Sequence, residues 1–344
     1  MFDLSIYISL ALLFGIAAQF RSMGGYAFLR WIISVLERRF EVLYAVVLIT
    51  AIFSPFILND VVVLVLTPVL VKYAKQFSVD ITPLLVAEIT FTNIASSLTP
   101  LGNPQNILLW GTSGISARQF VAGTWLPLTI SGALAALSLL ALRGKVGDVK
   151  EGQTPAASPL PAVYLCLVAL IVFSLDLIGV SNVLALCVAF LLGFVFTFNS
   201  LRSFVGEFDF KSLLILYFLV GSVTLIAAIL QPILEPYVAP AAAGVQPYSA
   251  LFVLFVSNII SNVPATQLLL SVSHVPPHIA PQIAVEAGLA GNLDPTASFA
   301  NILALLIVRR SGLSIRKAVI LQFVVWKFVL DCVNDFDIQQ LTRF

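Results

Sequence analysis

Charge is scarce in this sequence of 344 residues, because Asp, Glu, Lys and Arg together make up only 10% of it. A soluble domain of ordinary composition carries about 25% charged residues. The sequence therefore lacks the charge that would cover a surface facing water. Apolar residues make up 60% of the chain and the mean hydropathy is +1.03. These values predict a chain that lies in a lipid bilayer.

Cysteine, histidine and net charge are also low, with three Cys, two His and a formal net charge of +1. The cysteines show neither a CxxC pair nor a metal-ligand spacing. His274 and His278 lie four residues apart, but the Pro276-Pro277 pair between them argues against a helical metal site. We therefore expect no cofactor and no nucleic-acid partner, and we expect the lipid bilayer and a small ion as partners.

Apolar runs of about 20 residues, the length that crosses a bilayer, recur along the chain. Six uninterrupted spans are predicted at 4–20, 121–142, 160–178, 181–198, 212–230 and 315–334. Two more spans, 81–110 and 281–308, are interrupted by polar residues and prolines at 99–104 and 292–295. Two stretches with polar tips, 41–75 and 247–275, have arms too short to cross and are predicted to be re-entrant hairpins. Segments 24–38 and 200–211 are predicted to be interfacial helices.

The predicted fold class is thus an all-α polytopic membrane protein with about eight membrane-spanning helices, two of them broken, and two re-entrant hairpins. Cytoplasmic loops of membrane proteins are enriched in Lys and Arg. If the N-terminus is outside, all 18 Lys and Arg except Arg118, Arg343 and Lys327 fall on the cytoplasmic side. We therefore expect a bacterial inner-membrane protein with its N-terminus outside.

The two interrupted spans share a pattern. Thr99-Pro100 precedes Asn106 by the same spacing as Asp294-Pro295 precedes Asn301, and the hairpin tips Asn59 and Asn262 each come before an interrupted span. The order of hairpin, broken helix and closing helix occurs twice with opposite predicted orientation, which indicates an inverted repeat. The predicted units are 1–40 (scaffold and interfacial helices), 41–142 (first repeat), 143–159 (cytoplasmic linker), 160–246 (scaffold helices) and 247–344 (second repeat).

Polar groups at these breaks are the candidate binding residues. Irregular backbone within a bilayer is tolerated only around a buried cavity. Helix N-termini at such a cavity suit an anion, and carbonyl oxygens suit Na⁺. Asp60 and Asp294 could bind a cation or cap a helix. The full candidate set is Asn59, Asp60, Thr99, Gly102, Asn103, Asn106, Ser261, Asn262, Thr266, Asp294, Thr296, Ser298 and Asn301, with possible Na⁺ ligands at Asn59, Asp60, Asn262 and Asp294.

Three segments resemble the ion transporter superfamily, which includes arsenite permeases, citrate and dicarboxylate symporters, and some sodium/proton antiporters. They are Asn59-Asp60 followed by Thr67-Pro68, the run from Asn93 through Thr99-Pro100-Leu101-Gly102-Asn103-Pro104 to Asn106, and Ser261-Asn262-Val263-Pro264-Ala265-Thr266. The resemblance implies an elevator-like mechanism, Na⁺ or H⁺ as coupling ion, and a possible homodimer. The first tip departs from the dicarboxylate symporters, which have a Ser-Asn-Thr pattern there, by carrying Asp60. The second break departs from many members, which have Thr-Pro-Ile-Gly-Ser there, by carrying Asp294.

The leading hypothesis is an ion-coupled secondary transporter of a small anion or oxyanion. A sodium/proton antiporter using Asp60 and Asp294 is the alternative, and a channel is a further one because broken helices also build selectivity filters. A rhomboid-like serine protease is a remote alternative suggested by Gly111-Thr112-Ser113-Gly114. A catalytic Ser needs a nearby base, and both His are predicted to lie in an outside loop. We therefore expect that the protein is not an enzyme.

Overall fold

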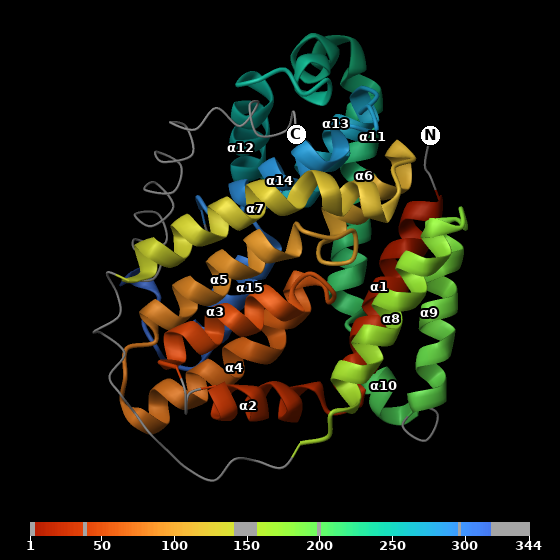
Figure 1. Cartoon of the computed structure of the whole chain (residues 1–344). Coiled ribbons are helices and arrows are strands. Elements are labelled where there is room, and N and C mark those ends of the chain that lie inside the picture. Colours follow the sequence, from red (N-terminus) through yellow and green to blue (C-terminus); the bar gives the residue numbers. More distant parts are fainter. Residues whose placement is uncertain (1–3, 37–39, 141–156, 198–200, 295–296, 318–344) are drawn as a thin grey trace.

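The computed structural model describes residues 4–36, 40–140, 157–197, 201–294 and 297–317 (Figure 1). All regular elements within these ranges are helices, which confirms the predicted all-helical class for this part of the chain. The helices are α1 (Leu4–Ser22), α2 (Gly25–Leu36), α3 (Val42–Phe53), α4 (Asn59–Phe77), α5 (Thr82–Ser96), α6 (Pro104–Ser113), α7 (Ala117–Leu140), α8 (Leu160–Leu177), α9 (Asn182–Thr197), α10 (Leu201–Glu207), α11 (Phe210–Ala242), α12 (Tyr248–Ile260), α13 (Asn262–Val272), α14 (Ala280–Ala290) and α15 (Phe299–Arg310).

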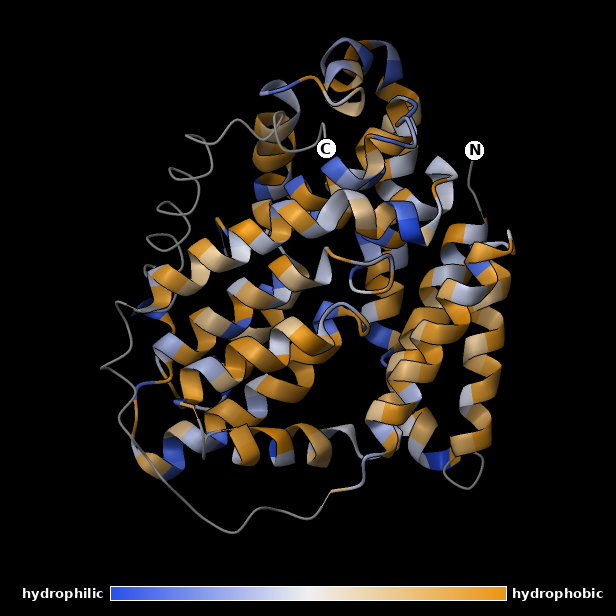
Figure 2. Ribbon diagram, in the orientation of Figure 1, coloured by the Kyte–Doolittle hydropathy of each residue, from blue (hydrophilic) through white to orange (hydrophobic). Residues whose placement is uncertain are grey.

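Apolar side chains dominate these helices (Figure 2), and α1, α7, α8 and α11 are long and apolar enough to cross a membrane. Helices α2, α3, α9 and α12 are apolar but shorter. These features are those of a polytopic membrane protein. Most of the predicted span 315–334 lies outside the described residues.

Two helices are longer than predicted, and in both the helix continues through proline. Helix α11 extends to Ala242 instead of 230 and contains Pro232, Pro236 and Pro240. Because these prolines are four residues apart, the hydrogen bonds that they remove lie along one side of the helix, and the other sides keep theirs. Helix α4 has 19 residues and passes through Pro68, whose ring lies on an exposed part of the helix.

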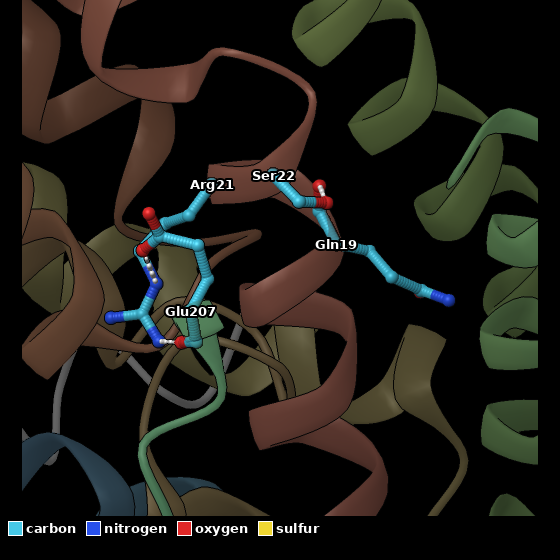
Figure 3. Close-up of polar contacts among 4 residues, drawn as sticks. All are labelled: Gln19, Arg21, Ser22 and Glu207. Atoms are coloured by element: carbon cyan, nitrogen blue, oxygen red, sulfur yellow. Dashed lines mark hydrogen bonds and ion pairs between the residues drawn. The ribbon is translucent and has the colours of Figure 1, made fainter. Parts of the chain in front are cut away.

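Helices α1, α8 and α9 stand side by side and form one bundle (Figure 1). Gln19 of α1 is buried between its neighbours, where its Nε2 donates to the Phe190 carbonyl at 2.9 Å and its Oε1 accepts from the Tyr164 hydroxyl at 2.5 Å. Figure 3 shows that Arg21, at the end of the same helix, points away from Gln19 and toward Glu207 of α10. The Arg21 and Glu207 side chains form an ion pair at 3.6 Å. These contacts fix α1 against the neighbouring helices.

The hairpins and broken helices pack together, and in each half the helix that follows the break contacts helices of the other half. In the first half, α5 packs against α3 and α4; in the second, α14 packs against α12 and α13. Helix α6, which follows the first break, packs against α13 and α14, whereas α15, which follows the second break, packs against α4 and α5. The two halves are therefore interlocked through the helices that follow their breaks.

Candidate functional site

The first break, between α5 and α6, is held by one asparagine and one threonine. Asn106 Nδ2 donates to the carbonyls of Thr99 at 2.7 Å and Ser96 at 2.9 Å. The Thr99 hydroxyl donates to the Pro55 carbonyl in the first hairpin tip and accepts from the Leu101 N–H at 3.1 Å. The side chains thus satisfy backbone carbonyls that the interrupted helix leaves without a partner.

The second break, between α14 and α15, repeats this arrangement at the same spacing. Asn301 Nδ2 donates to the Gly291 carbonyl at 2.5 Å, ten residues earlier, and to the Asp294 carbonyl at 3.5 Å, seven residues earlier. Asn106 reaches carbonyls ten and seven residues before itself in the same way. The repeated sequence pattern therefore corresponds to a repeated hydrogen-bond arrangement.

Each hairpin tip is attached to the break of its own half by an equivalent backbone hydrogen bond. The Asn59 N–H donates to the Gly102 carbonyl, and the Asn262 N–H donates to the Ala297 carbonyl, both at 2.9 Å. Each tip asparagine also accepts, through its Oδ1, a hydrogen bond at 2.9 Å from the N–H of the residue that follows it. In each half, tip and break thus form one connected unit.

The two units meet at a cavity of about 100 Å³. Its polar lining comes equally from the two halves, with Asn59, Asp60 and Asn103 from the first and Ser261, Asn262 and Ser298 from the second. Phe14 of α1 and three apolar residues of α11 contribute an apolar wall, and Ser212 of α11 also lines the cavity. Residues of the hairpins, the breaks and helices α1 and α11 therefore line one site.

Four helices begin at this cavity. Asn59 is the first residue of α4, Asn103 precedes α6, and Ser261 and Ser298 precede α13 and α15. Helix N-termini present unpaired N–H groups and a partial positive charge, which favour an anion or other hydrogen-bond acceptor. The cavity thus has positive helix ends but, among its described lining residues, neither Lys nor Arg.

Unsatisfied donors and one carboxyl group distinguish the two sides of the cavity. On the second half, the Asn262 Nδ2 and Ser298 Oγ atoms are buried and have no hydrogen-bond partner among the described residues. On the first half, Asp60 lies in the first turn of α4 and is 6% exposed. The second half can therefore donate to a bound ligand, whereas the first half can hold a cation or accept a proton.

The second tip also contains strained backbone. Ser261 has φ 74° and ψ 157°, a conformation that is almost confined to glycine. The corresponding residue of the first tip, Leu58, has φ −46° and ψ 131°. Strain of this kind costs about 1–3 kcal/mol and is concentrated at functional sites.

The structure separates the predicted site residues into two groups. Asn59, Asp60, Asn103, Ser261, Asn262 and Ser298 line the cavity. Thr99, Gly102, Asn106 and Asn301 instead form the hydrogen bonds that hold the breaks and tips. The buried Thr266 hydroxyl and the half-buried Asp294 are not among the residues that line the cavity, and Thr296 lies outside the described residues.

Asn93 was not predicted as a site residue, although it connects the two halves. Its Nδ2 lies 2.9 Å from the side-chain oxygens of Asn292 and Asn301 and 3.1 Å from the Gly291 carbonyl. Asn292 Nδ2 in turn donates to the Thr90 carbonyl at 3.2 Å. The sequence signal was an amide in the last turn of the apolar helix α5, a few residues before the first break.

Replacing Asn93 by Ala is expected to destabilise the protein by about 1–3 kcal/mol, because it removes the donor from buried oxygens at the second break. Thermal unfolding of the purified protein measures this change. Asn258→Ala is the matched control, because Asn258 Nδ2 donates only locally, to the Leu254 carbonyl at 2.6 Å. Equal melting temperatures for the two variants would show that the hydrogen bonds of Asn93 to the second half contribute little to the stability of the protein.

Comparison with known proteins identifies relatives over most of the chain. The sequence model of a family described as "Citrate transporter" matches residues 1–291. The inner membrane protein YbiR of Escherichia coli is 33% identical over 275 residues, which cover 78% of this chain and 69% of YbiR. An uncharacterized transporter of Methanocaldococcus jannaschii is 28% identical over 293 residues, 79% of this chain and 72% of the relative.

A shorter match is to a silicon efflux transporter of Oryza sativa subsp. japonica. It is 36% identical over 92 residues, which cover 27% of this chain and 19% of the rice protein.

Proposed function

Because the chain belongs to the citrate transporter family and is thus a membrane transporter rather than an enzyme, we propose that it is an ion-coupled secondary active transporter of a small anion or oxyanion. The cavity between the two halves carries this proposal. Four helix N-termini and the free donors of Asn262 and Ser298 supply a place for ligand oxygens. The Asp60 carboxyl supplies a place for a coupling cation.

The size and charge of the cavity favour a substrate of a few heavy atoms. About 100 Å³ is small beside the several hundred Å³ of a typical organic-ligand pocket. A multiply charged carboxylate would also meet no Arg or Lys on the described lining. The silicon efflux transporter among the relatives is named for an element that forms a small oxyacid. We therefore favour a small neutral or singly charged inorganic oxyacid over citrate.

The coupling ion in this proposal is Na⁺ or H⁺. Asn59, Asp60, Asn262 and Asp294 are the proposed Na⁺ ligands, because they supply carboxylate and amide oxygens at or beside the breaks. A carboxyl group at bilayer depth is costly and usually has a functional role. An antiporter that exchanges Na⁺ for H⁺ at Asp60 is the second candidate function, supported by that carboxyl group.

The proposed transport mechanism follows from the connected tips and breaks. We propose about eight membrane-spanning helices, with α3–α4 and α12–α13 as re-entrant hairpins of an inverted repeat, and the N-terminus outside the bacterial inner membrane. The hairpins and broken helices would move together against α1, α8, α9 and α11 in an elevator-like cycle. The interlocked packing of α6 and α15 supports movement of both halves as one body. A homodimer through the scaffold helices belongs to the same proposal.

Uptake into proteoliposomes tests the function. The probes are arsenite, silicate, phosphate, sulfate and citrate, each with imposed Na⁺ or H⁺ gradients and with a membrane potential. A cycle that moves one positive charge inward is expected to concentrate its substrate about fifty-fold per 100 mV. Downhill flux without accumulation would indicate a channel. Na⁺-dependent proton movement without any of the anions would indicate the antiporter.

A further inference from the structure

Glu88 is a buried carboxyl group outside the cavity. It lies on α5, is 0% exposed, and accepts a hydrogen bond at 2.8 Å from the Thr67 hydroxyl of α4 through Oε1. Its other oxygen, Oε2, is buried and has no hydrogen-bond partner among the described residues. Half of this carboxyl group is therefore available for a ligand that the described residues do not supply.

A second buried glutamate shows what a structural carboxylate looks like in the same molecule. Glu286 of α14 accepts hydrogen bonds from Gln246 at 2.5 Å, Ser249 at 2.7 Å and Gln282 at 2.9 Å, and these bonds use both of its oxygens. Hydrogen bonds from three donors favour the ionised form of a carboxyl group. Of the residues that the structure describes, one donates to Glu88, so its environment differs in kind from that of Glu286.

No cation pairs with Glu88 among the described residues. Helix α5 packs against α3, α4, α7, α14 and α15. The charged groups on these helices are Asp60, Lys72 and Lys75 of α4, Arg118 of α7, Glu286 of α14, and Arg309 and Arg310 of α15. Among the described residues, the ion pair within 4 Å is that of Arg21 with Glu207. Within the described part of the chain, an ionised Glu88 would thus be a buried charge without a counter-charge, which is strongly unfavourable.

One further unsatisfied group lies beside Glu88. The Thr92 hydroxyl is buried without a hydrogen-bond partner among the described residues, and Thr92 follows Glu88 by one helical turn on the same face of α5. An unsatisfied carboxylate oxygen and an unsatisfied hydroxyl therefore share one face of α5 in an apolar interior. A proton on Glu88 Oε2 is the smallest ligand that would neutralise the carboxylate.

We propose that Glu88 is a proton-binding site, separate from the cavity, through which the transport cycle is coupled to H⁺. This inference rests on the proposed function as a coupled transporter. The proton enters from water onto Oε2 in one state of the cycle and returns to water from the same oxygen in the other. Thr67 positions the carboxyl group through its bond to Oε1.

The location of Glu88 explains how proton binding would act on the cavity. Helix α4 begins at the first tip with Asn59 and Asp60, and α5 ends at the first break. The bond from Thr67 to Glu88 joins these two helices in their buried interface. Loss of the proton places an unpaired charge there, which favours a rearrangement that exposes Glu88 to water. Both helices bear cavity or break residues, so this rearrangement reaches the substrate site.

Infrared spectroscopy of the purified full-length protein in liposomes tests the site without a transport substrate. The wild type is expected to show a protonated-carboxyl carbonyl band that shifts in D₂O, and Glu88→Gln is expected to lose the component of this band that Asp60→Asn keeps. Glu286→Gln is the matched control and should keep the band. Thr67→Val retains the glutamate and should shift the frequency of the band. An unchanged band in Glu88→Gln, or a wild type with no such band, would overturn the proposal.

Transport by the same variants separates this proposal from the function on which it rests. In proteoliposomes, the accumulation driven by a pH gradient is expected to be at least about tenfold lower in Glu88→Gln than in the wild type. The exchange of labelled for unlabelled probe is expected to stay at the wild-type rate. Accumulation by Glu88→Gln equal to that of the wild type would refute Glu88 as a proton-coupling site and leave the transporter proposal, with Asp60 in the cavity, intact. A wild type that moves none of the probe anions would refute the proposed function, while the infrared band would still report proton binding.

Discussion

Asp60→Asn is expected to reduce gradient-driven accumulation of the substrate by about ten- to a hundredfold. The substitution keeps the size of the side chain but removes the negative charge from the cavity. Loss of a hydrogen bond or contact to a charged group costs about 1.5–3 kcal/mol, and each 1.4 kcal/mol corresponds to a factor of ten. Uptake into proteoliposomes with and without the ion gradient measures the effect.

Asp80→Asn is the matched control for this experiment. Asp80 lies at the start of α5, outside the cavity, where its Oδ1 accepts from the Thr82 N–H at 2.9 Å. An amide oxygen can still accept that hydrogen bond, so transport should stay near the wild-type level. If Asp60→Asn accumulates substrate as well as Asp80→Asn does, Asp60 does not bind the coupling ion.

Gly102→Ala is expected to have the largest effect on stability, a loss of about 3 kcal/mol or more. A Cβ atom at this position would lie 2.3 Å from the Ser96 carbonyl oxygen and 2.6 Å from the Ser54 carbonyl oxygen. Both are backbone atoms of the first break and the first tip, which cannot move aside as a flexible side chain would. Overpacking of a well-filled interior costs about 1–3 kcal/mol and occasionally more. Thermal unfolding in detergent measures the loss.

Gly132→Ala provides the comparison for this prediction. Its added methyl group would have its nearest neighbours, the Ile94 and Phe91 side chains, at 3.9 Å, which is ordinary contact. The methyl group should leave the melting temperature nearly unchanged. A Gly102→Ala protein as stable as Gly132→Ala would mean that the tip and the break are less tightly packed than the structure indicates.

The positions of both breaks could be predicted because proline and polar residues interrupt long apolar runs. The pattern Thr99-Pro100 with Asn106, and Asp294-Pro295 with Asn301, indicated which residues correspond in the two halves. The structure adds that Asn106 and Asn301 hold the backbone and do not line the cavity. Sequence spacing locates an asparagine at a break, but it does not show whether its amide faces the ligand or the chain.

Other features depend on contacts between distant segments and could not be predicted from local pattern. Asn93 meets residues about 200 positions later in the chain, so its role appears only when the two halves are packed together. Ser212 lines the cavity because α11 happens to lie beside both tips. The extension of α11 through three prolines likewise contradicts the local rule that proline ends a helix.

If the cavity shared by the two halves binds the substrate, ligand-induced thermal stabilisation of the protein should depend on Ser298, and Ser298→Ala removes its hydroxyl from the cavity lining. Ser257→Ala is the matched control, because both hydroxyls are buried without a hydrogen-bond partner among the described residues and only Ser298 lines the cavity. With arsenite, silicate, phosphate, sulfate and citrate as ligands, at least one should raise the melting temperature of the wild type and of Ser257→Ala. The account predicts that Ser298→Ala loses most of this shift, and an undiminished shift in Ser298→Ala would contradict it.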